Sequence, residues 1–177
     1  MTLPPREREV PTFDGNRRLV RELVGAGARF LVVGGSAMLW YFSERQVGNN
    51  DLDLLVEDTP ENAARVVSAV NALGFAGDTF TPERFSQRQN TLVRLNDGMT
   101  VLADLLTRCD LPFPELWAEA TDGLLLGHPV KVASPATLWL MLEESAESKH
   151  IADRELLKPL VGDGGVDHLR GRSSPPR

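Results

Sequence analysis

The sequence has almost no cysteine, and Cys109 is the only one in 177 residues. A single cysteine excludes an internal disulfide and a cysteine-rich zinc site, so we expect a reducing, cytoplasmic setting. Aromatic residues make up only 6% of the chain, but 42% of the residues are hydrophobic. That fraction is enough to bury a core without covalent or metal cross-links.

Long apolar runs are also missing. The longest one, residues 30–42, is too short for a bilayer and is interrupted by two glycines and a serine. The first nine residues contain no apolar stretch, so we expect no signal peptide. The sequence therefore predicts a protein without a membrane partner.

Positive charge is in deficit, because 19 basic residues face 25 acidic ones and the net charge is −6. This balance argues against a protein that coats nucleic acid through a general basic surface. A local basic stretch contains Arg84, Arg88 and Arg94, which we interpret as a solvated loop, with phosphate contact as the alternative. His150 and Asp153 are one helical turn apart, a spacing that permits metal binding, and we interpret them as polar residues of an exposed helix face.

The length predicts one domain, and the composition divides the chain into four segments. These are a flexible arm over residues 1–12, a core over 13–132, a helical segment over 133–161 and a disordered tail over 162–177. Apolar residues follow strand spacing in 29–33, 51–56, 91–95, 99–106 and 124–132, and helical spacing in 16–24, 37–42, 63–73 and 135–160. The pattern predicts an α/β (α+β) fold, with helices on the faces of a mixed sheet and a short helical C-terminal segment.

Two local signals fix parts of this order. Asn96, Asp97 and Gly98 stand between two apolar runs, which predicts a β-hairpin. Ser134 followed by Pro135 is typical of a capped helix start. We expect that helix to be interrupted near residues 145–149.

A glycine pair follows the first predicted strand, as Gly34, Gly35 and Ser36. Two glycines let backbone N–H groups approach a ligand closely, and the start of the next helix adds the positive end of a dipole. The Ser36 hydroxyl can donate to the same anion. Taken alone, these residues are equally well explained as a turn.

Three aspartates stand on predicted strands. Asp51 and Asp53 are two residues apart and therefore share one face of their strand. Two adjacent carboxylates repel unless a cation lies between them, and oxygen ligands suit Mg²⁺. Asp104 lies between apolar residues of a later strand, which by itself favours a position at the rim of the sheet. If the two strands are neighbours, Asp104 completes a site for two metal ions.

The order of these motifs resembles the nucleotidyltransferase superfamily of DNA polymerase beta. The family pattern is a hydrophobic residue, Gly, Gly or Ser, and Ser, then a spacer, then Asp-hydrophobic-Asp/Glu-hydrophobic. Gly34 to Ser36 and Asp51 to Val56 follow that pattern, with Asp104 as the later strand acid. The chain is most similar to small prokaryotic Gly-Gly-Ser members related to abortive-infection toxin nucleotidyltransferases.

The resemblance implies transfer of a nucleoside monophosphate from an NTP, with ATP expected, to an acceptor hydroxyl and release of pyrophosphate. Gly34, Gly35 and Ser36 would hold the β- and γ-phosphates. Asp51 and Asp53 would coordinate two Mg²⁺ ions, and Asp104 would coordinate one of them and assist deprotonation of the hydroxyl. The acceptor is a protein side chain, a tRNA end or a small molecule, and the resemblance also implies a toxin–antitoxin type protein partner.

Close relatives often carry Arg-x-Thr-x before the first aspartate, where this chain has Val47 and Asn49, with Arg45 nearby. Relatives also often carry a lysine in the helix after the Ser-Pro start, where this chain has the apolar residues 140–142, ending at Leu142. The triphosphate then needs another cation, for which the candidates are Lys131, Lys149 and Arg154. Two alternatives remain: a catalytically degenerate, antitoxin-like binding or regulatory module, and a phosphotransferase that uses the same metal site.

Overall fold

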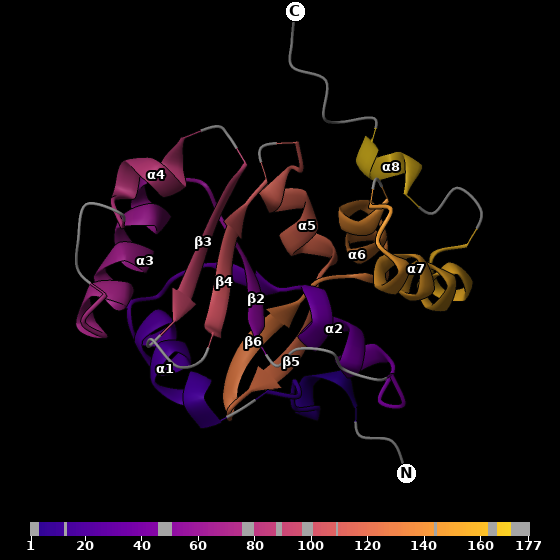
Figure 1. Ribbon diagram of the computed structural model, residues 1–177, viewed down its shortest axis with the longest axis horizontal. Helices are drawn as coiled ribbons and strands as arrows, with labels where there is room; N and C mark the ends of the chain where they lie inside the picture. Colours follow the sequence, from indigo (N-terminus) through magenta and orange to yellow (C-terminus); the bar gives the residue numbers. More distant parts are fainter. Residues whose placement is uncertain are drawn as a thin grey trace, which may run out of the picture.

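A computed structural model describes residues 4–12, 14–45, 51–75, 80–87, 90–96, 101–108, 110–143, 145–162 and 166–170. The strands in these ranges form one six-stranded sheet in the order β3-β4-β2-β1-β6-β5 (Figure 1). They are β1 (Phe30–Val32), β2 (Leu52–Val56), β3 (Thr91–Asn96), β4 (Val101–Thr107), β5 (Thr121–Leu125) and β6 (His128–Val132).

The sheet is mixed, as the sequence predicts. β2 runs parallel to β4 and β1 runs parallel to β6, whereas the other three neighbouring pairs are antiparallel. β3 and β4 form the predicted antiparallel pair, although the predicted turn residues Asp97 and Gly98 lie outside the described residues. The extended segment predicted over 124–132 is a pair of strands, as its pattern indicates, although β5 begins earlier, at Thr121.

Helices flank the sheet (Figure 1). They are α1 (Arg17–Gly25), α2 (Gly34–Tyr41), α3 (Pro60–Ala72), α4 (Pro82–Ser86), α5 (Phe113–Glu119), α6 (Pro135–Leu142), α7 (Ser148–Val161) and α8 (Asp167–Arg170), with 3-10 turns η1 (Pro5–Glu7) and η2 (Asp14–Asn16). Among the described residues, no helix is both long enough and apolar enough to cross a membrane. α1 and α3 pack together and bury Leu19, Leu23, Val66 and Val70 in the core.

Helix starts follow local chemistry. The Thr59 hydroxyl accepts a hydrogen bond from the Asn62 N–H at the start of α3, and the Ser134 hydroxyl accepts one from the Thr137 N–H at the start of α6. In both helices proline occupies the first helical position, where its missing N–H costs no hydrogen bond. α6 ends at Leu142 and α7 begins at Ser148, which confirms the predicted interruption.

The described residues of both terminal segments contain structure that the sequence does not predict. In the segment expected to be a flexible arm, Glu9 forms a parallel bridge with Leu124 of β5 and Val10 is buried. In the segment expected to be a disordered tail, residues 167–170 form α8, and Val166 and Leu169 are buried. The physical reason is the same at both ends, because a few apolar side chains reach the core in segments that are otherwise polar.

Candidate active site

The register of the sheet brings the three aspartates together. Asp53 of β2 is paired with Asp104 of the parallel strand β4, so their side chains leave the sheet on one face. Asp51 directly precedes β2 and shares that face, while Leu52 and Leu54 are fully buried on the other. Each aspartate offers a carboxylate oxygen, and the three oxygens lie within 4.8 Å of one another. The predicted convergence of Asp51, Asp53 and Asp104 is therefore present in the structure.

The glycine pair lies directly against this cluster. α2 begins at Gly34, whose φ of 55° is in the region that favours glycine. A Cβ atom at Gly34 would lie 2.0 Å from the Asp53 Oδ2 atom, so no larger residue fits without movement of the carboxylate. The Gly35 N–H donates a hydrogen bond to the same oxygen at 3.2 Å. Ser36 is 7% exposed and is not among the residues that line the cavity beside the cluster, so its contact with phosphate stays a prediction.

Asp53 is the electrostatically costly member of the cluster. Burial raises its pKa from the ordinary value of 3.8 to about 6, and the neighbouring Asp51 and Asp104 carboxylates act in the same direction. The Gly35 N–H and the charge of Lys149 lower the pKa but do not cancel the shift. Near neutral pH the site therefore holds a carboxylate in surroundings that penalise negative charge.

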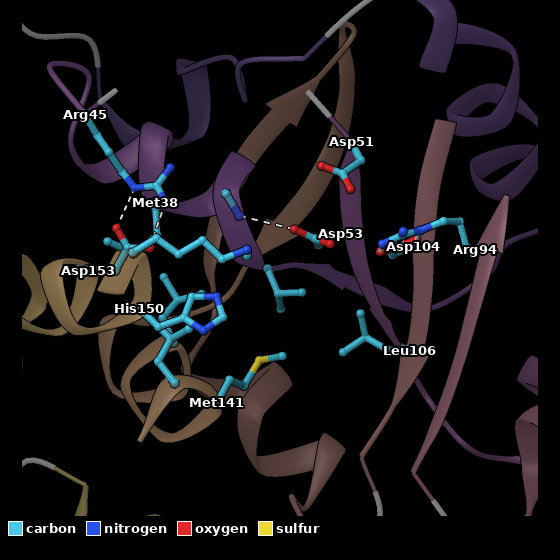
Figure 2. Close-up of a pocket in the computed structure, with 16 residues that line it drawn as sticks. Met38, Arg45, Asp51, Asp53, Arg94, Asp104, Leu106, Met141, His150 and Asp153 are labelled. Atoms are coloured by element: carbon cyan, nitrogen blue, oxygen red, sulfur yellow. Dashed lines mark hydrogen bonds and ion pairs between the residues drawn. The ribbon is translucent and has the colours of Figure 1, made fainter. Parts of the chain in front are cut away.

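A cavity of about 340 Å³ opens in front of the aspartates, within the size range of small-molecule sites. Figure 2 shows Asp51, Asp53 and Asp104 on one side and His150 and Asp153 on the other. Apolar side chains complete the wall: Val33, Met38, Leu106, Leu138, Met141 and Leu142. The helical segment α6–α7 thus forms the wall that faces the sheet.

Arg94 binds the third aspartate. Arg94 lies opposite Asp104 in the β3–β4 register, and its Nε and Nη2 atoms donate to the two Asp104 carboxylate oxygens at 2.8 and 2.6 Å. The pairing holds the pKa of Arg94 above its ordinary value, first through this hydrogen bond and then through the charge of Asp104. The interpretation of Arg94 as part of a solvated loop is wrong, because it lies on a strand and its guanidinium contacts the acidic cluster.

A second ion pair closes the other end of the cavity. The Arg45 Nε and Nη2 atoms donate to Asp153 Oδ1 and Oδ2 at 2.5 and 2.7 Å. Asp153 is buried, so its interpretation as part of an exposed helix face is wrong. One sequence signal was available, because Asp153 lies four residues before the apolar Leu157 and therefore shares the buried face of α7. His150 also lines the cavity and shares a hydrogen bond with the Ser145 hydroxyl through Nδ1.

The candidate triphosphate cations separate clearly. Lys149 lines the cavity and forms an ion pair with Glu147 at 3.3 Å, whereas Lys131 forms an ion pair with Asp122 at 2.8 Å and does not line the cavity. Arg154 donates from Nη1 to the main-chain oxygens at the end of α6, among them Leu142 and Glu143. Of the three candidates, Lys149 alone faces the aspartates. Val47 and Asn49 lie outside the described residues.

The donor set fits divalent metal ions. Three carboxylates from two neighbouring strands present only oxygen ligands, which Mg²⁺ prefers. A cation would also relieve the repulsion that contributes to the raised pKa of Asp53. Asp51, Asp53 and Asp104 are therefore the residues that would hold such ions.

Comparison with known proteins gives a fold relationship. No family model matches the sequence, and no curated protein sequence matches it. The solution structure of the antibiotic-resistance factor ANT(2'')-Ia matches with a TM-score of 0.51 and 17% identity, over 90% of this chain and 91% of that one. The crystal structure of ANT(2'')-Ia with adenylyl-2''-tobramycin gives a TM-score of 0.49 and 18% identity, over 88% and 94% of the two chains. The chain therefore has the mixed-sheet fold of a nucleotidyltransferase, as the motifs predict.

Proposed function

We propose that this chain transfers a nucleoside monophosphate from an NTP to a hydroxyl group of a small molecule and uses two Mg²⁺ ions. The observation that carries the proposal is the convergence of three aspartate carboxylates within 4.8 Å at the Gly34–Gly35 turn. The nucleotidyltransferase fold supports it. ATP is the expected donor.

The three aspartates have different proposed roles. Asp51 and Asp53 hold the metal ions, and Asp104 holds one of them and accepts the proton of the acceptor hydroxyl. The hydroxyl oxygen forms a bond to the α-phosphorus, the bond from that phosphorus to the bridging oxygen breaks, and pyrophosphate leaves. When bound, the metal ions neutralise the charge that develops on the phosphate oxygens. The contribution of the protein is largely to position these groups.

Lys149 is the proposed cation for the triphosphate. It lines the cavity from α7, and its charge reaches Asp53, whose pKa it lowers slightly against the larger effects of burial and neighbouring acids. Its side chain and that of its ion-pair partner Glu147 are both 61% exposed, so Lys149 can leave Glu147 for a phosphate without loss of core packing. Lys149 therefore substitutes for the basic residue that is missing near Leu142.

A small-molecule acceptor is favoured over RNA or a protein side chain. The cavity volume of about 340 Å³ suits a small ligand. The net charge of −6 disfavours a polyanionic acceptor. The fold is similar to that of an antibiotic-resistance factor, and antibiotics are small molecules.

The test uses NTPs labelled at the α- or γ-phosphate. The protein is incubated with Mg²⁺, each labelled NTP and three separate acceptor pools, namely small metabolites with hydroxylated antibiotics, RNA, and protein. We expect α-label to enter the small-molecule pool and γ-label to leave as pyrophosphate. The Asp53→Ala variant should lose transfer by a factor of about a thousand or more, while Arg108→Gln, which removes an ion pair with Asp110 outside the cavity, should keep it.

Each other result selects a different function. Transfer of γ-label to an acceptor identifies a phosphotransferase. α-Label in RNA or protein changes the acceptor class but keeps the chemistry. No transfer into any pool, together with unchanged NTP binding by Asp53→Ala, identifies a binding module and overturns the proposal.

A further inference from the structure

Arg94 binds the carboxylate of Asp104, which is one of the three ligands of the proposed metal site. Its guanidinium spans both oxygens of Asp104, at 2.8 and 2.6 Å. The same Asp104 carboxylate belongs to the cluster of oxygens within 4.8 Å. A divalent cation on Asp104 would therefore lie next to a guanidinium of the same sign of charge.

The two partners differ in their freedom to move. The Asp104 side chain is 8% exposed, whereas the Arg94 side chain is 53% exposed. Arg94 lies on β3, an edge strand of the sheet, beside Leu92, which is 57% exposed. A rotation of the Arg94 side chain towards solvent therefore breaks no core packing, while Asp104 has no comparable path.

We propose that Arg94 is a displaceable counter-ion: it neutralises Asp104 in the metal-free protein and leaves that carboxylate when a divalent cation binds. The inference rests on the proposed metal site and adds a step before catalysis. With Arg94 in place, both oxygens of Asp104 accept strong, charge-assisted hydrogen bonds. Neither oxygen is then free to ligate a cation. Arrival of the cation releases the guanidinium, and Asp104 becomes a metal ligand.

The opposite role predicts the opposite sign. If Arg94 only held Asp104 in the correct orientation for the metal, its removal would weaken metal binding, since an unrestrained carboxylate is less well positioned. If Arg94 competes with the metal, its removal strengthens binding. The direction of the change in affinity therefore separates displacement from a purely structural contact.

The experiment measures Mn²⁺ affinity without nucleotide or acceptor, from the free-ion signal in electron paramagnetic resonance. We expect Arg94→Gln to bind Mn²⁺ about tenfold more tightly than the parent, because one close like charge is gone, and Arg94→Lys to lie between them. Arg108→Gln removes a bidentate pair of the same kind outside the cavity and should leave the affinity unchanged. In an Asp104→Asn background, Arg94→Gln should have no effect.

Melting temperatures in EDTA and in Mn²⁺ supply a second readout. Arg94→Gln should melt below the parent in EDTA, and Mn²⁺ should raise its melting temperature by more than it raises that of the parent. Equal or weaker Mn²⁺ binding by Arg94→Gln overturns displacement but leaves the metal site intact. If neither the parent nor any variant binds Mn²⁺, the metal site of the proposed function is absent and the displacement proposal falls with it.

Discussion

The two ends of the cavity carry the same kind of ion pair in different surroundings (Figure 2). At the α7 end, Arg45 and Asp153 have side chains that are 14% and 6% exposed. At the sheet end, Arg94 and Asp104 have side chains that are 53% and 8% exposed. Both arginines bind their carboxylate through two nitrogen atoms, so the difference lies in solvent and not in hydrogen-bond geometry.

This difference separates a fixed contact from an exchangeable one. When one partner of a buried pair is removed, the other charge is left without solvent or counter-ion, which is strongly unfavourable. Opening of a pair with a half-exposed arginine costs less, because water solvates the guanidinium that is released. We infer that Arg45–Asp153 fastens α7 to the segment after α2, whereas Arg94–Asp104 can open during function.

Removal of Arg45 is the largest expected effect. Arg45→Gln leaves the buried Asp153 carboxylate without its cation and should lower the free energy of unfolding by about 3–5 kcal/mol. Arg94→Gln in EDTA should lower it by less, because the half-exposed Arg94 guanidinium is partly solvated and gains less from its carboxylate. Urea unfolding of both variants beside the parent measures the contrast.

A double substitution serves as the control for Arg45→Gln. Arg45→Met combined with Asp153→Leu removes both charges and keeps side-chain volume, so it should be less destabilising than Arg45→Gln alone. Equal losses for Arg45→Gln and Arg94→Gln would show that exposure does not distinguish the two ends of the cavity.

Removal of charge at the sheet end should have the opposite sign. Asp53→Asn keeps an amide oxygen that can accept the Gly35 N–H but deletes a carboxylate whose pKa is raised to about 6 by burial and its acidic neighbours. In EDTA at pH 7, the variant should be more stable than the parent by an amount on the order of 2–3 kcal/mol. Urea unfolding at a series of pH values measures it.

The pH dependence of the stability difference between the parent and Asp53→Asn identifies its cause. Near pH 4 Asp53 is protonated in the folded parent, so parent and variant should have similar stability. As the pH rises towards 6, the unfolded chain releases the proton that the folded state retains, and the parent loses stability relative to Asp53→Asn. Above about pH 6 the difference should be constant. A difference that is independent of pH from 4 to 8 would assign the effect to packing and not to charge.

The acidic cluster could be predicted because it rests on short-range rules. A two-residue period places Asp51 and Asp53 on one face of a strand whatever the rest of the fold does. The glycine pair after a strand is similarly local, and the structure gives it a reason in the close approach of Gly34 to Asp53. Only the adjacency of Asp104 needed the strand order, which the resemblance to a known fold provided.

The two arginine pairs could not be predicted because they depend on long-range geometry. Arg45 and Asp153 are 108 residues apart, and their contact depends on how α7 docks. Arg94 and Asp104 are close in sequence, but the β3–β4 pairing contains an irregularity between Leu95 and Asn96. A one-residue change of register would turn Arg94 to the other face relative to Asp104. Turn chemistry alone does not set that register.

A smaller effect should separate the close approach of Gly34 from its backbone conformation. Gly34→Ala places a Cβ atom against the Asp53 carboxylate and also strains a positive φ, whereas Gly127→Ala, at φ 81°, meets no atom within 4 Å. The strain at a positive φ costs about 1–2 kcal/mol in both variants. We expect Gly34→Ala to lose about 1–2 kcal/mol more than Gly127→Ala and to lose nucleotide transfer as well. Equal stability and retained transfer in both would remove the steric role of Gly34.

The smallest expected effect concerns Ser36, which is 7% exposed at the start of α2. If its hydroxyl donates to a phosphate, as the resemblance implies, Ser36→Ala removes one neutral hydrogen bond of about 1 kcal/mol, and the dissociation constant for an NTP rises about fivefold. Ser43→Ala, at an exposed position after α2, is the matched control and should not change it. Isothermal titration with a non-hydrolysable NTP analogue measures both affinities, and thermal unfolding measures both stabilities.

A Ser36→Ala protein that binds the analogue as tightly as the parent but melts at a lower temperature would show that the hydroxyl contributes to helix packing, since Ser36 does not line the cavity. In that case Lys149 is left as the proposed phosphate contact, because the Gly35 N–H already donates to Asp53.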